Sequence, residues 1–124
     1  MFGFLNPIKN IANQYCRCVK YAFDELGITG VFPLDDLNID RIFDCLIKMD
    51  GCALTQDQKE VIKLAKQEMI RIKKENSLTT SSARDVAWIL IMTNLNHNHW
   101  QLVFLENINV INSVLKKHFW YLEK

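Results

Sequence analysis

The chain has 124 residues, of which 49% are hydrophobic, and its formal net charge is +1. This length is enough for one compact domain with a buried core, and it is too short for two domains of ordinary size. The near-zero net charge excludes a strong overall attraction to nucleic acid or to an anionic membrane. We therefore expect a single domain over residues 1–124.

Charge is nevertheless uneven along the chain. Residues 21–50 contain seven acidic and two basic residues, whereas the remainder has an excess of basic residues. The longest uninterrupted apolar run, Val86 to Met92, is far shorter than a membrane span, and the N-terminal residues lack the pattern of a secretion signal. We expect a cytoplasmic protein without a membrane partner, in which the four cysteines are reduced thiols.

The first predicted helix spans residues 7–26. Asn6 supplies a cap, Pro7 suits the first helical position, and Gly27 ends an apolar repeat with helical spacing. Residues 27–36 contain two glycines and a proline without sustained alternation of apolar and polar residues. We predict that this segment is a loop.

The second and third predicted helices follow this loop. Asn38 is the expected cap of a short second helix that ends at Gly51. Thr55 and Gln58 have the spacing of a capping box, and the apolar face that begins there continues to Asn76. The third helix is predicted to be strongly amphipathic.

The last two predicted segments are more apolar. Ser82 is the expected cap of residues 83–95, which are apolar nearly all round and predict either a central helix or a buried strand. In the junction that follows, Asn98 is expected to cap a fifth helix with Gln101 as its capping-box partner, and Trp100 to pack at the first turn. The predicted core stripe of that helix is Phe104, Ile108, Ile111, Leu115, Phe119 and Leu122. The fold class is therefore all-α, an irregular bundle of about five helices.

A metal site is the first chemistry to consider. Cys16 and Cys18 on the first helix, with His97 and His99 in the junction, offer four ligands that zinc accepts. Residues two apart on a helix point about 200° away from each other, so Cys16 and Cys18 cannot face one ion while the helix stays intact. We expect no metal and no cofactor.

Catalytic signatures are also missing from the sequence. The four glycines are scattered and form no phosphate-binding loop, and no cysteine or serine stands in a nucleophile motif. Asp40 and Asp44 lie one helical turn apart, but acids near a helix start are favoured by the helix dipole without any chemistry. We expect that the protein is not an enzyme.

Two charged surfaces are candidates for binding. Several acids gather around the start of the second helix, where their summed field would attract a basic partner. These acids are Asp35, Asp36, Asp40 and Asp44. The third helix has a stripe of lysines that could follow a phosphate backbone, although interleaved glutamates favour a solvated face. The stripe consists of Lys59, Lys63, Lys66, Lys73 and Lys74.

An aromatic residue is the third candidate. With the core stripe fixed, Trp120 falls on the polar side of the fifth helix. It is either covered by the N-terminal residues or exposed as an anchor for a partner, since tryptophan is enriched among interface hot spots.

Together these features favour a protein that binds another protein. In general terms the chain resembles helical bacterial immunity proteins, and the first hypothesis is an inhibitor of a basic toxin or effector, such as a nuclease, that acts by covering its surface. The same residues would suit a phage-type antagonist of a host system. The alternative from a different class is a nucleic-acid-binding regulator that uses the lysines of the third helix.

Overall fold

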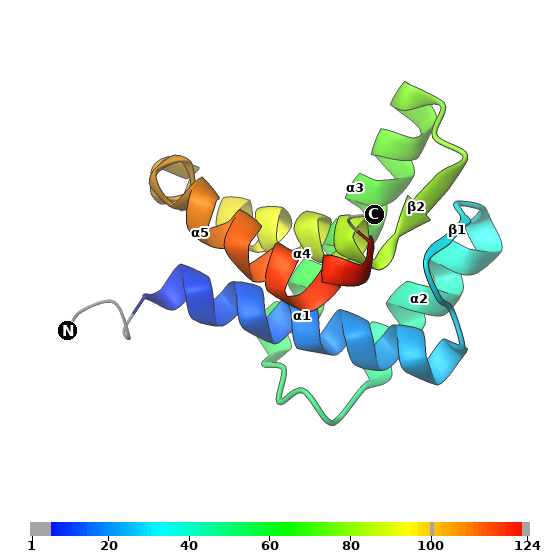
Figure 1. The fold of residues 1–124 in the computed structure, drawn as a ribbon, viewed down its shortest axis with the longest axis horizontal. Coiled ribbons are helices and arrows are strands. Elements are labelled where there is room, and N and C mark those ends of the chain that lie inside the picture. The colour runs from blue at the N-terminus through cyan, green and yellow to red at the C-terminus, as the bar shows by residue number, and fades with distance from the viewer. Residues whose placement is uncertain (1–5, 100, 123–124) are drawn as a thin grey trace.

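The computed structural model describes residues 6–99 and 101–122, with the backbone alone for residues 101–105 (Figure 1). It is 77% helical, with five α-helices and one small two-stranded sheet in the described part, so the predicted all-α bundle is confirmed. The helices are α1 (Pro7–Leu26), α2 (Asp36–Lys48), α3 (Gln56–Asn76), α4 (Ala83–His97) and α5 (Gln101–Phe119). The shorter elements are the strands β1 (Val31–Pro33) and β2 (Thr80–Ser82) and the 3-10 turn η2 (Trp120–Leu122).

Local signals fixed several helix ends as predicted. The Asn6 side chain accepts hydrogen bonds from the first turn of α1, and Gly27 ends that helix with a left-handed φ of 69°. Such a conformation is easily reached by glycine because it has no Cβ. Thr55 and Gln58 form the predicted capping box of α3, and Ser82 caps α4.

The start of α2 differs from the prediction. Asp35, not Asn38, is the cap, and its side chain accepts a hydrogen bond from the Asn38 backbone N–H at 2.8 Å. Asn38 lies inside the helix and donates from Nδ2 to the Pro33 carbonyl at 2.8 Å. The reason is that the Leu34 N–H is held by the Thr79 carbonyl, so the chain is extended up to Leu34 and turns at the first capping residue beyond it.

The segment 27–36, which was predicted to be a loop, contains the short strand β1, and β1 pairs with a second short strand before α4. β1 and β2 pair in antiparallel register, with Phe32 opposite Ser81. Phe32 is buried, and its ring meets that of Phe23 on α1 at 5.5 Å between centroids in an edge-to-face arrangement. Three residues are too few to show an alternating pattern, so this pairing depends on contacts made by the folded chain.

The junction after α4 also corrects a prediction. Asn98 is the C-cap of α4 and not the N-cap of α5, because its backbone N–H and its Nδ2 both donate to the Asn94 carbonyl. The amide side chain thus adds a second hydrogen bond to the Asn94 carbonyl at the helix end. His99 follows with a φ of 60°, in the left-handed region. Trp100 lies outside the described residues.

The core lies around two central helices. α1 packs against α2, α4 and α5, and α4 packs against α1, α3 and α5. Figure 1 shows α5 running beside α1 in the same direction, with α4 behind them. Tyr15 of α1 donates a buried hydrogen bond to Asn94 of α4 at 2.7 Å. Because α4 is covered on several sides, its sequence is apolar nearly all round, and the choice between helix and strand is settled in favour of a helix.

The predicted stripe of α5 is confirmed in its second half. Ile111, Leu115 and Phe119 are fully buried, whereas Ile108 is 36% exposed and was wrongly assigned to the core. The stripe assumed packing along the whole helix, but Ile108 lies a turn before the first of these buried residues. The Phe104 side chain lies outside the described part. No helix in that part is long and apolar enough to span a bilayer.

Candidate functional site

The two charged surfaces predicted from the sequence lie against each other. α2 packs on α3, and Lys66 Nζ lies 2.7 Å from Asp40 Oδ1. Further along α3, Lys73 Nζ lies 3.5 Å from Asp36 Oδ1. The hydrogen bond from Lys66 to Asp40 raises the pKa of Lys66. Half of the predicted acidic cluster is therefore paired with the predicted lysine stripe.

The rest of α3 neutralises much of its own charge. Lys63 lies 3.3 Å from Glu60, and the Arg71 guanidinium bonds both Glu68 and Glu75. Within the described residues, only Lys59 and Lys74 of the predicted stripe have no carboxylate partner. The stripe thus offers much less free positive charge than the sequence suggests.

The remaining predicted acids differ in role. The Asp35 side chain is used as the cap of α2. Asp44 is exposed, and among the described residues it has no ion pair. The field expected of four adjacent acids is consequently weakened by local partners.

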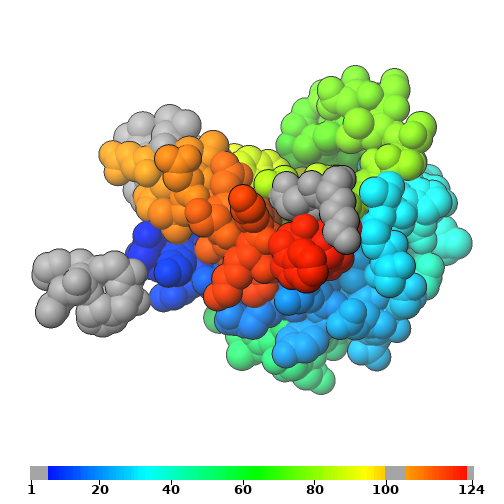
Figure 2. Space-filling model, viewed as in Figure 1, coloured from blue at the N-terminus to red at the C-terminus, as the bar shows by residue number. Residues whose placement is uncertain are grey.

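The C-terminal aromatic residues form an exposed surface instead. Trp120 is 63% exposed and Tyr121 is 42% exposed, and their rings meet edge to face at 6.1 Å. Trp120 is therefore exposed in the described structure, while the N-terminal residues that were its predicted alternative cover lie outside the described residues. In Figure 2 the red C-terminal end of the chain lies on the surface beside the blue α1. A large apolar side chain in water is a common mark of a binding surface.

One carboxylate, that of Asp24, lies near the Tyr121 ring. Partial burial, with a smaller contribution from the charge of Asp24, raises the pKa of Tyr121. Asp24 also lines a hollow of about 1020 Å³ between the end of α1 and the end of α2, together with Glu25, Asp50, Lys48 and the 55% exposed Tyr21. We call the combined surface the aromatic–acidic face. It consists of Tyr21, Asp24, Glu25, Asp50, Trp120 and Tyr121.

Sequence reasoning found only Trp120 of this face. Tyr21, Asp24 and Glu25 have the (i, i+3) and (i, i+4) spacing of neighbours on one side of a helix, which was a usable signal. The position of Asp50, which follows α2, beside α1 could not be foreseen, because it depends on how the two helices pack.

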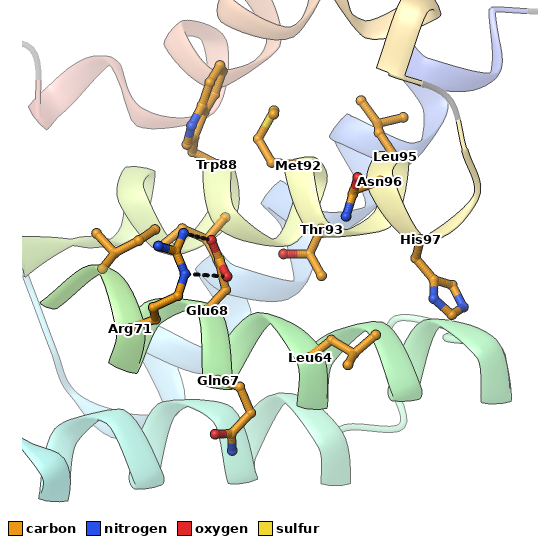
Figure 3. A pocket seen from close by; sticks show the side chains of 12 residues that line it. Leu64, Gln67, Glu68, Arg71, Trp88, Met92, Thr93, Leu95, Asn96 and His97 are labelled. Carbon is orange, nitrogen blue, oxygen red and sulfur yellow. Dashed lines mark hydrogen bonds and ion pairs between the residues drawn. The ribbon is translucent and has the colours of Figure 1, made fainter. Parts of the chain in front are cut away.

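A second hollow lies between α3 and α4. It has a volume of about 670 Å³ and a mostly apolar lining that includes Leu64, Trp88 and Met92 (Figure 3). In Figure 3, Glu68 and Arg71 face each other across dashed lines. Because these two charged groups bond each other, the lining around them is mainly apolar, and His97 stands at the end of the groove.

The histidines and cysteines have structural partners. His97 Nε2 lies 3.1 Å from Asp57 Oδ1, which joins the end of α4 to the start of α3. Cys16 and Cys18 are both buried, and burial raises the pKa of the Cys16 thiol to about 12. No group of three or more His, Cys, Asp or Glu residues in the described part of the chain is arranged to hold a metal ion.

The chain was also compared with known proteins. A scan of protein-family models, a search of curated proteins and a search of solved structures each returned no match. The function therefore has to be argued from the residues and their geometry.

Proposed function

We propose that the protein is a cytoplasmic, non-catalytic inhibitor that binds a basic protein through the aromatic–acidic face. The observation that carries this proposal is the 63% exposed Trp120, which stands beside Tyr121, and Tyr121 in turn lies near the carboxylate of Asp24. An immunity-type protein that covers the surface of a basic toxin, such as a nuclease, would use such a face.

The aromatic rings would supply most of the affinity. Tryptophan and tyrosine bury large areas with few rotatable bonds, and they dominate the energetics of many interfaces. Trp120 and Tyr121 already contact each other, so little side-chain freedom is left to lose on binding.

The carboxylates would supply steering. Asp24, Glu25 and Asp50 carry no ion pair within the described residues, unlike Asp36 and Asp40. Lys48 lines the same hollow and offsets one of these three charges, so an acidic excess is available to a basic partner. It would raise the association rate more than the final affinity. The proposed steering acids therefore lie at the ends of α1 and α2 and not at the start of α2.

Other functions that suit the sequence are affected differently by the structure. A phage-type antagonist of a host system would use the same face and would differ only in its target. A nucleic-acid-binding regulator that uses α3 loses support, because Lys66 and Lys73 are already paired with Asp40 and Asp36.

The proposal is tested by capturing partners from the native host with the wild type, with Trp120→Ala and with a control variant. Leu37→Ala is a matched control, since Leu37 is 68% exposed on α2 and does not belong to the aromatic–acidic face. We expect the wild type and the control to retain one basic protein whose activity they inhibit, and Trp120→Ala to bind it about 30-fold or more weakly.

Salt and charge provide the second part of the test. Asp24→Asn with Glu25→Gln should slow association at low salt, and the difference should shrink as salt is added. A partner whose affinity is unchanged by Trp120→Ala, or one that is bound without being inhibited, would contradict the proposal.

A further inference from the structure

A second group of cations belongs to α1 and α5. α1 carries Lys9, Arg17 and Lys20, and α5 carries Lys116 and Lys117. Positions 9, 13, 17 and 20 follow one another at helical spacing, so the three α1 cations lie along one side of the helix with Asn13 between them. Within the described residues none of these five cations has a carboxylate partner, in contrast to Lys66 and Lys73.

The packing of α5 on α1 brings the two sets of cations together. His118 Nε2 on α5 lies 2.8 Å from Asn13 Oδ1 on α1, which fixes the two helices relative to each other. Burial lowers the pKa of His118, and the charges of Lys20, Lys117 and Arg17 lower it further. Cations from both helices therefore surround one point without an internal counterion.

A hollow on this side of the molecule adds polar and apolar surface. Its volume is about 450 Å³, and Lys9 and Lys117 both line it. Asn13 and Ser113 add hydrogen-bonding groups, and the apolar part includes Val114. The hollow therefore offers charge, hydrogen bonds and an apolar wall together.

We propose that this cationic α1–α5 surface binds the phosphate backbone of single-stranded nucleic acid. Unpaired cations in a row are the groups that phosphates recognise, because each contact releases a bound counterion. From Lys9 to Lys20 the row extends about 16 Å along α1. Asp24, one turn beyond Lys20, marks its end by repelling phosphate. The cations of this surface are Lys9, Arg17, Lys20 and Lys117, and Lys116 precedes Lys117 in the sequence.

The character of the hollow favours a single strand over a duplex. Asn13, Ser113 and Val114 can contact sugars and unstacked bases, which a duplex keeps within its stack. None of these groups belongs to the aromatic–acidic face. The proposal therefore stands or falls separately from the proposed inhibitor function.

Fluorescence anisotropy with a labelled oligothymidine of about 12 nucleotides tests this inference. We expect binding by the wild type at low salt, with a slope of log K against log salt of about −3.5 for five phosphate contacts. Arg17→Glu with Lys20→Glu and Lys117→Glu should weaken binding about tenfold or more and make the slope shallower.

A matched variant separates this surface from overall charge. Lys59→Glu with Lys63→Glu and Lys74→Glu makes the same change in net charge on α3, and it should leave the affinity within about threefold of the wild type. If circular dichroism shows that the glutamate variant on α1 and α5 is unfolded, the same three positions are changed to glutamine. The loss of affinity is then measured with that variant.

Four results would overturn the inference. The first is no binding to the oligonucleotide at low salt, and the second is an equal loss of affinity in the α3 variant. The third is tighter binding to a duplex of the same length, which would exclude the single strand as the preferred ligand. The fourth is a loss on Trp120→Ala as large as that of the α1–α5 variant, which would move the site to the aromatic–acidic face.

Discussion

The α2–α3 side of the molecule pairs opposite charges across two helices, whereas the α1–α5 side brings like charges together. On the α2–α3 side, Asp40 and Asp36 pair with Lys66 and Lys73 from the neighbouring helix. On the α1–α5 side, Arg17, Lys20 and Lys117 lie around His118 without such partners in the described structure.

This difference shows why a charge count along a sequence is a weak guide to a binding surface. Exposed pairs contribute little stability, but they remove each other's field at a distance. The strongest charge runs in the sequence cancel where α2 meets α3, and the less conspicuous charges of α1 and α5 remain available. Function is better sought where packing leaves charge and aromatic surface uncompensated.

The largest expected effect is a loss of stability, and it should distinguish a buried side chain on the α1–α5 side from an exposed one. Phe119→Ala removes a fully buried ring and should lower the free energy of unfolding by about 3–5 kcal/mol. Trp120→Ala changes the adjacent, 63% exposed residue and should cost less than about 1 kcal/mol. Urea denaturation measures both, and similar losses would mean that Trp120 is part of the core.

A smaller effect should appear in the pH dependence of stability. The pKa of His118 is lower in the folded protein than its ordinary value of 6.5, because burial and neighbouring cations disfavour its charged form. The unfolded chain therefore binds the proton more readily, so stability is retained above pH 6.5 and falls as the pH drops from 6.5 toward the lower folded value. The slope from this group cannot exceed about 1.4 kcal/mol per pH unit.

His118→Gln tests the origin of that slope. Urea denaturation at pH values between about 7.5 and 5.5 should show a weaker pH dependence in this variant than in the wild type. His99→Gln, which removes an exposed imidazole, controls for general effects of losing a histidine. Unchanged pH dependence in His118→Gln would show that other groups cause it.

The smallest expected effect is the change in stability when one lysine from each side is replaced. Lys66→Gln removes a partly buried partner of Asp40 and should destabilise the protein by about 0.2–1 kcal/mol, less so at high salt. Lys20→Gln removes a charge that faces other cations and should be neutral or stabilising by a few tenths of a kcal/mol. Denaturation at low and high salt distinguishes the two, and a loss of equal size in Lys20→Gln would contradict the comparison.

The sequence predicted the helical elements well where the signal is local. Asn6, Gly27, Thr55 and Ser82 were placed correctly as caps, because capping is decided by a few adjacent backbone groups. It was less successful at Asp35 and Asn98, where two neighbouring residues compete and the packing of the adjoining segment decides. β1 and β2 were missed for the same reason, since three-residue strands depend on a partner far away in the chain.

The candidate sites show the same division. The sequence by itself determined that five amphipathic or apolar helices form, which residues cap most of them and that Trp120 lies on a polar side. Only the tertiary structure decided that Asp40 meets Lys66, that Asp24 lies near Tyr121 and that Arg17 and Lys117 both lie near His118. The physical reason is that helix formation depends on residues within a few positions, whereas the field at a surface depends on every charge that packing brings within a Debye length.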